Sequence, residues 1–140
     1  MRAAFRAGTC LAALATCGSV FAADAEDRIA RGKYVVESVA ICQDCHTPRN
    51  EKGELDEGRW LEGGPVPFRP TRPGGDWADV VPAIAGLPGW LEDEDVVTLL
   101  MTGRRPDGRR PKPPMKAFGM KREDAEAAVA YLRSLRPASK

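Results

Sequence analysis

The sequence predicts an all-α fold in which three main helices are joined by long loops rich in glycine and proline. Apolar residues recur at helical spacing in three stretches of the 140-residue chain, and no alternating run is long enough to indicate a strand. The loops, residues 47–89 and 103–119, are long for a small domain, so the helices alone would bury too small a core. A large apolar group held inside the chain would complete such a core.

The first helix is expected from Asp24, which can cap its N-terminus while Asp27 occupies the capping-box position three residues later. The apolar face of this helix consists of Ile29, Gly32, Val35, Val36 and Val39. Because this face runs toward Cys42, the end of the helix should position the cysteines that follow.

The second helix is expected to begin after Trp90. Acidic residues fill positions 92–95, where negative charge interacts favourably with the positive end of the helix dipole. The inward face consists of Val96, Val97, Leu99 and Leu100. Gly103 can end the helix in a left-handed conformation.

The third helix has Glu123 and Asp124 in its first turn, and Pro137 lies beyond its end. Its apolar residues at helical spacing are Ala125, Ala128, Val129, Leu132 and Leu135. We expect this helix to pack in the core.

The pentapeptide Cys42-Gln43-Asp44-Cys45-His46 is typical of a covalent attachment site for c-type haem. Thiols three residues apart lie on one face of a helical turn, where they can add to the two vinyl groups of a porphyrin. His46 follows at once and can bind the iron as the proximal ligand. The motif therefore predicts one covalently bound haem c, and this haem would supply the apolar group that completes the core.

Three other interpretations of the motif are open. A thioredoxin-like redox pair would need a strand, a helix and a second strand around it, and no strong strand precedes Cys42. A structural zinc site usually needs four Cys or His ligands, more than this chain offers outside its N-terminal segment. A chance C-x-x-C-H on an unrelated domain is the third, so the motif needs support from the rest of the chain.

The N-terminal segment resembles a secretory signal peptide. Arg2 and Arg6 precede an apolar run over residues 7–22, which ends in the small-residue pattern Val20-Phe21-Ala22. We expect a signal peptide over residues 1–22, a single mature domain over 23–140 that holds the haem, and a periplasmic location. The run is shorter than the roughly 20 residues of a membrane span, so no transmembrane segment is expected in the mature chain.

A lipid anchor is the alternative for this segment. Leu14-Ala15-Thr16-Cys17 resembles a bacterial lipoprotein cleavage site, although a smaller residue than Thr16 is usual. Removal of residues 1–22 would leave Cys42 and Cys45 as the only cysteines. Thioether bonds to haem would consume both thiols, and c-type haem is attached outside the cytoplasmic membrane, so the export signal and the motif agree.

Charge in the mature chain is balanced overall and uneven locally. Without Arg2 and Arg6 there are 19 basic and 20 acidic side chains, so no overall field indicates nucleic acid. Residues 104–116 carry six basic side chains and one acidic one, whereas 51–62 and 92–95 are acidic. The basic segment is either a solvated loop or a docking surface for an acidic partner.

Over most of its mature length the chain resembles a class I c-type cytochrome, similar to the single-haem modules in cytochrome subunits of bacterial alcohol and sugar dehydrogenases. The resemblance rests on Arg31-Gly32-Lys33-Tyr34, Cys42 to Pro48, Gly63-Gly64, Ile84 to Trp90, Met101-Thr102-Gly103, Asp107-Gly108, Pro113-Pro114-Met115, Glu123-Asp124 and Ala130 to Leu135. It implies the cytochrome c fold, with Gly32 allowing close approach of the helix that carries Tyr131. Leu91 and Lys121 depart from the family, because Ser or Thr is usual at these helix starts.

The second axial ligand of the iron should be a methionine, because His46 is the only histidine. Met101 lies among core residues of the second helix, and Met120 adjoins the last helix and can cover a haem edge. Met115 lies in a loop whose prolines restrict the backbone. The resemblance also implies Met115 as the ligand, so the predicted haem-binding residues are Cys42, Cys45, His46 and Met115, with His46 and Met115 on the iron.

A His/Met-ligated haem predicts an electron carrier and not an enzyme. The thioether favours ferrous iron, and two filled axial positions leave no open site for oxygen or peroxide. The expected partners are redox proteins, with a dehydrogenase as donor and an oxidase or another cytochrome as acceptor. The alternatives are a haem sensor or peroxidase-like protein with a displaceable sixth ligand, and a structural subunit that never exchanges electrons.

Overall fold

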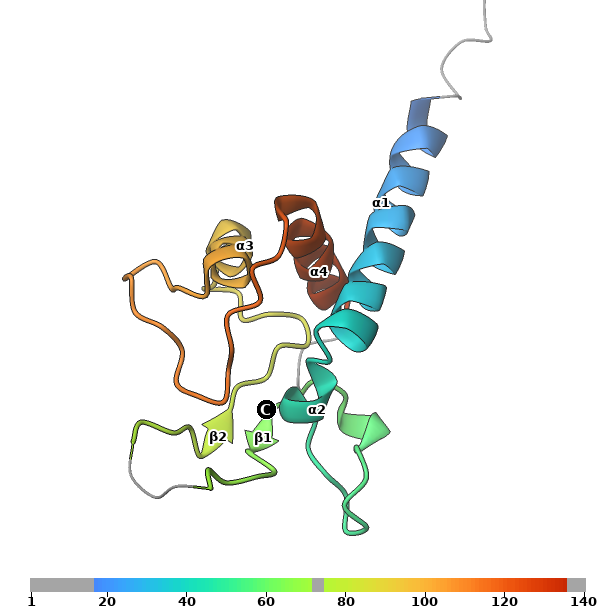
Figure 1. Ribbon diagram of the computed structural model, residues 1–140. Coiled ribbons are helices and arrows are strands. Elements are labelled where there is room, and N and C mark those ends of the chain that lie inside the picture. The colour runs from blue at the N-terminus through green and yellow to red at the C-terminus, as the bar shows by residue number, and fades with distance from the viewer. Residues whose placement is uncertain (1–16, 72–74, 136–140) are drawn as a thin grey trace, which may run out of the picture.

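The computed structural model describes residues 17–71 and 75–135, and this part of the chain is mostly helical (Figure 1). These described residues form four α-helices where the sequence predicted three main ones, because a short additional helix carries most of the cysteine motif. In chain order the elements are α1 (Cys17–Tyr34), the π-helix η1 (Val35–Val39), α2 (Gln43–His46), the 3₁₀-helix η2 (Glu57–Arg59), β1 (Gly64–Pro65), β2 (Val80–Val81), α3 (Asp93–Thr102) and α4 (Arg122–Ser134).

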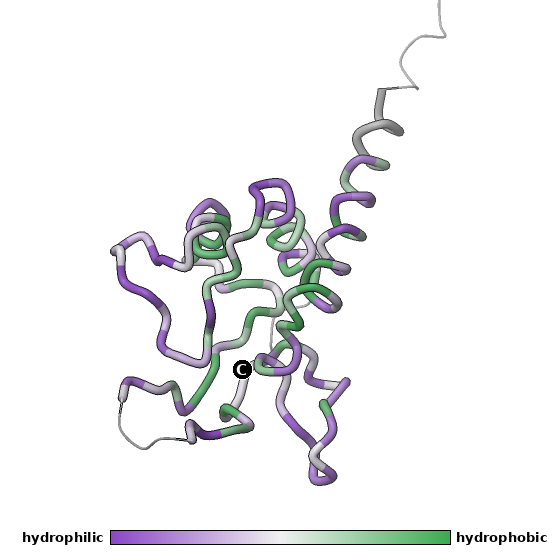
Figure 2. Tube along the Cα trace, viewed as in Figure 1, coloured by the Kyte–Doolittle hydropathy of each residue, from purple (hydrophilic) through white to green (hydrophobic). Residues whose placement is uncertain are grey.

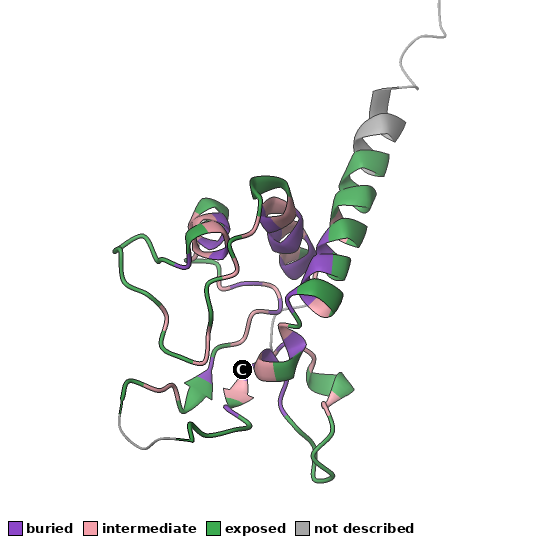
Figure 3. Cartoon of the chain, viewed as in Figure 1, coloured by how far each residue is buried: buried purple, intermediate pink, exposed green. Residues whose placement is uncertain are grey.

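Helix α1 is longer than the sequence predicted. It already runs from Cys17, so the prediction that Asp24 caps its N-terminus was wrong for the chain as it stands. The helix therefore extends into the predicted signal peptide, and of its residues before Asp24 only Ala22 and Ala23 are strong helix formers. The first turns of α1 stand away from the other elements (Figure 1), and residues 23–28 are exposed along them (Figure 3).

Helices α1 and α4 cross at Gly32, as the resemblance implied. A Cβ atom at Gly32 would lie 1.9 Å from the Ala127 carbonyl oxygen and 2.7 Å from the Tyr131 Cβ. At the edge of this crossing the Arg31 guanidinium pairs with Asp124 at 2.7 Å. Only the absence of a side chain at Gly32 allows the two backbones to come so close.

The hydrophobic core lies where α4 packs against α1 and α3, and Figure 2 shows apolar stretches of all three helices meeting there. Its buried members are Val35, Val36, Leu61, Ala85, Leu87, Val96, Val97, Leu100, Ala125, Ala128, Val129, Tyr131 and Leu132. Most of them belong to the helical faces that the sequence predicted, whereas Leu61, Ala85 and Leu87 come from the long loop. This loop therefore completes part of the core.

The ends of α3 and α4 agree with the sequence in part. Helix α3 is preceded by Glu92, so the prediction that Leu91 occupies its cap position was wrong, and Gly103 ends it at φ 70° as expected. Lys121 precedes α4 and makes no side-chain capping bond, as expected. Neither α3 nor α4 has a side-chain cap at its start. Acidic residues in the first turn of each helix still interact favourably with the helix dipole.

The long loop is ordered by hydrogen bonds to backbone atoms. Strands β1 and β2 form one short antiparallel ladder that pairs Gly64 with Val81 and Pro65 with Val80. Further along, the Gly86 amide donates to the Leu132 carbonyl of α4 at 2.8 Å. Within the described segments, no helix combines the length and the apolar character that a membrane crossing requires.

Candidate functional site

Helix α2 presents the cysteine motif after an unusual turn. The π-helix η1 ends at Val39, and Ile41 then adopts a left-handed conformation with φ 54°. For a β-branched residue this conformation is strained and is found where the surrounding fold requires it. The turn directs the chain into α2, where the His46 amide donates to the Cys42 carbonyl at 2.9 Å. The motif is therefore helical, as predicted.

Cys42 and Cys45 are free thiols, and both are half-buried. Burial raises the pKa of Cys42 to about 11, and the nearby ammonium of Lys116 opposes this rise. Burial and the charge of Asp44 also raise the pKa of Cys45. Both groups are therefore protonated at neutral pH, and an S–H group can add across a vinyl double bond.

His46 is buried, with 8% of its surface exposed, and its ring is fixed from the loop side. Its Nδ1 lies 2.9 Å from the Pro82 carbonyl oxygen, so the neutral ring must donate from Nδ1. Burial lowers the pKa of His46 and favours this neutral form. The lone pair of Nε2 is then free to bind a metal, which is the usual arrangement of a metal-ligating histidine.

Gly63 holds the backbone of the same histidine. The Gly63 amide donates to the His46 carbonyl at 2.7 Å, and Gly63 has φ +75°. A Cβ atom there would lie within 2.6 Å of backbone atoms of Val81, Pro82 and Ala83. Pro82 also accepts the hydrogen bond from the His46 ring. The close approach of Gly63 to residues 81–83 therefore fixes both the backbone and the ring of His46.

Met115 lies in the loop between α3 and α4, and the sequence neighbours of Met115 line two hollows. Pro113 borders a hollow of about 490 Å³, and Lys116 borders one of about 220 Å³ that also contacts Val39 and Ala40, just before the cysteine motif. The Pro113 carbonyl accepts a bond from Ala78 at 2.8 Å, which ties this loop to the β1–β2 connection. The loop of Met115 thus runs from one hollow to the other.

The other two methionines of the described chain, Met101 and Met120, lie against the hydrophobic core. The Met120 amide also donates to the Leu100 carbonyl at 3.2 Å. Met115 is half-buried and is not among the side chains that pack there. The structure therefore separates Met115 from the two methionines that serve the core.

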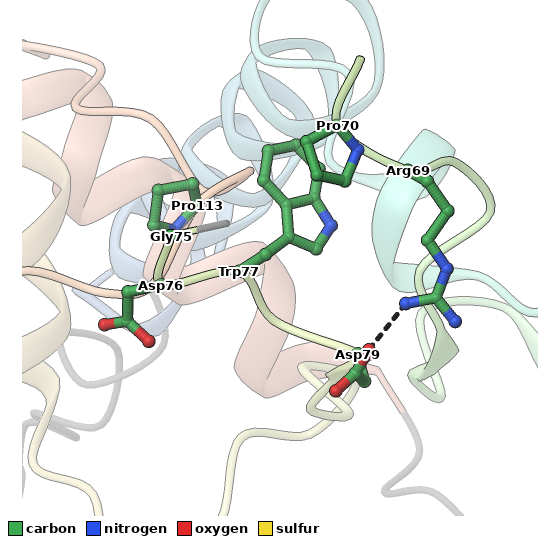
Figure 4. A pocket seen from close by; sticks show the side chains of 7 residues that line it. All are labelled: Arg69, Pro70, Gly75, Asp76, Trp77, Asp79 and Pro113. Carbon is green, nitrogen blue, oxygen red and sulfur yellow. Dashed lines mark hydrogen bonds and ion pairs between the residues drawn. The ribbon is translucent and has the colours of Figure 1, made fainter. Parts of the chain in front are cut away.

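Trp77 is a feature of the site that sequence reasoning missed. Its Nε1 atom is buried and has no acceptor among the described residues. Figure 4 shows the indole in the larger hollow together with Arg69, whose guanidinium pairs with Asp79 at 2.5 Å. A buried donor without an acceptor indicates that a further group belongs in this hollow. Nothing in the sequence marks Trp77, because only the fold leaves its N–H unpaired.

The fold and this arrangement define a mostly helical protein with two free thiols beside a buried, neutral histidine. The Cytochrome c family matches residues 29–136, a span that includes the motif and all three methionines just described. The chain belongs to the Cytochrome c family, and its predicted resemblance to c-type cytochromes is confirmed.

Two relatives support this assignment. A diheme cytochrome c-type protein of Cereibacter sphaeroides is 34% identical over 108 residues, which cover 74% of this chain and 34% of that protein. The fructose dehydrogenase cytochrome subunit of Gluconobacter japonicus is 31% identical over 114 residues, which cover 75% of this chain and 21% of that protein. The chain thus spans about a third and about a fifth of the length of these curated relatives.

Membership of the family implies covalently bound haem c with iron and indicates an electron-carrying role. The residues present fit this group. Cys42 precedes α2 directly and Cys45 lies in it, a neutral histidine nitrogen is available beside them, and Met115 lies in the loop between α3 and α4. The Trp77 N–H borders the larger hollow without an acceptor, and a carboxylate of the haem would supply one, whereas the Arg69 guanidinium there is already paired with Asp79.

Proposed function

We propose that this protein is a periplasmic c-type cytochrome with a single haem, which transfers one electron at a time between a dehydrogenase and a downstream acceptor. It would act as a free carrier or as a subunit of a larger complex. The observation that carries the proposal is the state of His46, which is buried, neutral and bonded through Nδ1 to the Pro82 carbonyl. A histidine in this state, directly after the two cysteines, leaves Nε2 available to one metal centre.

Cys42 and Cys45 would hold the porphyrin through thioether bonds, and His46 would bind the iron from the α2 side. The haem supplies a one-electron Fe(III)/Fe(II) couple when bound. The Pro82 and Gly63 contacts keep the imidazole in one orientation, so His46 would remain a ligand in both oxidation states. Trp77 would donate to a carboxylate of the porphyrin, which would give its buried N–H an acceptor.

Met115 would supply the second axial ligand. Its loop borders both hollows, and it is not engaged in the core packing that holds Met101 and Met120. The soft sulfur favours the ferrous state, and a filled sixth position excludes oxygen and peroxide from the iron. These properties support an electron carrier.

The basic segment 104–116 would face a redox partner with an acidic surface, either a donor dehydrogenase or an acceptor oxidase or cytochrome. Arg109 pairs with Asp107 and Lys112 with Asp76, each at 2.7 Å. Arg104, Arg105 and Arg110 are exposed and have no ion pair within the described chain. These three cations are available to a partner.

Residues 1–22 would direct export and be removed. Residues 1–16 lie outside the described residues, and so does most of the lipoprotein-like sequence that ends at Cys17. Localisation can be tested by fractionation of cells that express the whole chain, in which the mature form should be released with the periplasmic contents. Retention with the membranes would favour the lipid anchor on Cys17.

Absorption spectroscopy tests the haem proposal most directly. The chain is expressed with its leader in a host that matures c-type haem, and spectra are recorded before and after reduction. Haem retained after denaturation, together with a near-infrared sulfur-to-iron band that disappears in Met115→Ala, is the expected result. The variants Met101→Ala and Met120→Ala are matched controls and should keep this band. A protein without covalent haem would refute the proposal, and a high-spin spectrum would favour a sensor or peroxidase-like protein.

A further inference from the structure

Trp90 is the most exposed large apolar side chain of the described residues, with 80% of its surface accessible. Its neighbours in the same loop, Ala85 and Leu87, are buried in the core. A tryptophan can bury 150–250 Å², so the exposed indole leaves on the order of 150 Å² of mostly apolar surface in water. Aromatic side chains displayed in this way are enriched in protein interfaces.

The loop that carries Trp90 is held rigidly. The Arg133 guanidinium of α4 donates to the carbonyl oxygens of Leu87 at 3.0 Å and Pro88 at 3.4 Å, and it also bonds the Leu91 carbonyl. The same guanidinium pairs with Asp93 at 2.7 Å. Because the loop is fixed before any partner arrives, binding through Trp90 would lose little conformational entropy.

The side chains next to Trp90 carry negative charge. Asp93 and Glu94 are neutralised by Arg133 and Arg122, whereas Glu92 and Asp95 have no ion pair among the residues that the structure describes. The surface formed by Trp90, Glu92 and Asp95, which we call the acidic tryptophan face, therefore combines an apolar centre with uncompensated negative charge. A partner for it needs cationic side chains that can stack on an indole.

The same chain carries such side chains at the other end of α3. Arg104, Arg105 and Arg110 follow the helix, and together they form what we call the arginine loop. The ten residues of α3 span about 15 Å, so the two charged surfaces of one molecule are held apart. Within one molecule they cannot neutralise each other, but two molecules arranged head to tail could bring them together.

We propose that the acidic tryptophan face of one copy docks on the arginine loop of a second copy. The contact joins two different surfaces, so it is heterologous and extends into short chains of molecules instead of closing into a symmetric dimer. Guanidinium groups of the loop stack on Trp90 and pair with Glu92 and Asp95. The contact is small and largely electrostatic, so it is weak and sensitive to salt.

Only the functional consequence of this contact, electron transfer between copies, rests on the proposed function. In that role a second copy of the chain is one redox partner. The basic segment was expected to meet an acidic face with which electrons are exchanged, and a second copy offers such a face. Association would place one carrier beside the next, so that electrons could pass between copies. The association itself is measurable without any redox reaction.

Sedimentation velocity of the mature, haem-loaded protein tests the proposal. The weight-average sedimentation coefficient should rise between about 10 µM and about 1 mM protein, the range in which weak contacts form. The rise should occur at about 0.01 M salt and disappear at about 1 M, since the Debye length falls from about 30 Å to about 3 Å. Trp90→Ser should weaken association about tenfold or more. Val80→Ser, which changes a 64% exposed apolar residue on β2, should leave it unchanged.

Charge exchange identifies the two surfaces. The double variant Glu92→Lys/Asp95→Lys and the double variant Arg105→Glu/Arg110→Glu should each remain monomeric, because like charges then face each other. Their equimolar mixture should associate again, since each variant supplies the surface that complements the other. Glu51→Lys/Glu57→Lys, which makes the same change in net charge elsewhere, should associate as the native protein does.

Two results would overturn the inference. One is a native protein that stays monomeric at low salt and about 1 mM, and the other is a mixture of the reversed variants that stays monomeric. Haem content, read from the absorption of the same samples, reports separately on the proposed function. A colourless protein that still associates would refute the carrier role and leave the docking contact standing.

Discussion

Replacement of Gly32 by alanine should destabilise the protein, although alanine is the better helix former. Helix propensity alone favours Ala over Gly by roughly 0.5–1 kcal/mol. Against this, the new methyl group would lie 1.9 Å from the Ala127 carbonyl oxygen and 2.7 Å from the Tyr131 Cβ, so α1 and α4 must separate. Overpacking costs about 1–3 kcal/mol, and backbone atoms cannot move aside as a side-chain end can, so the upper part of this range applies.

The expected net loss for Gly32→Ala is about 2 kcal/mol in the free energy of unfolding. It can be measured by urea unfolding of the haem-loaded protein, followed by far-ultraviolet circular dichroism. Ala30→Gly is the matched control, because Ala30 is exposed on the same helix and should lose only the propensity difference. A Gly32→Ala protein as stable as the native one, or more stable, would refute the close-approach argument.

Three further changes test other parts of the fold. Arg133→Met should lower the free energy of unfolding by about 2 kcal/mol, because it leaves several loop carbonyls without their donor. Arg122→Met is the control: it removes only exposed ion pairs and should cost less than about 1 kcal/mol in the same urea titration. Gly63→Ala should lower the free energy of unfolding more than Gly53→Ala in that assay. Both glycines have positive φ, but only Gly63 is crowded by backbone atoms. Equal losses of stability would contradict this reasoning. Burial and Glu37 raise the pKa of Tyr131 from 10.0 to about 12, so the unfolded chain loses this proton first, and stability should fall as pH rises from about 10 to about 12. Tyr131→Phe should make that fall shallower, and an unchanged slope of unfolding free energy against pH would show that Tyr131 does not contribute.

The parts of the fold that were predicted correctly depend on local pattern. The apolar faces of α3 and α4 follow from residues three and four positions apart, and the left-handed end at Gly103 follows from a single residue type. The close approach at Gly32 came from resemblance to a family, and the geometry confirms it. The candidate ligands could be named for a related reason, since the cysteine motif is contiguous and the chain has one histidine.

The parts that were missed depend on residues far apart in the chain. The bond from His46 to Pro82 spans 36 positions, and the orphaned Trp77 donor exists only because the folded loop hides it. The left-handed conformation of Ile41 could not be predicted from the sequence, because isoleucine disfavours positive φ. The start of α1 was misjudged because a capping residue such as Asp24 can also lie inside a helix, and here the helix already runs from Cys17.

The two contacts that position His46 both end on backbone carbonyl oxygens. His46 donates to the Pro82 carbonyl, and Gly63 donates to the His46 carbonyl. A carbonyl is present whatever the side chain, so these loops can change in sequence while the histidine keeps its orientation. Glycine is the exception, because Gly63 provides both a positive φ and room for the approaching strand. Relatives that share only about a third of their residues with this chain can therefore retain the same site geometry, provided that the glycine and the histidine are kept.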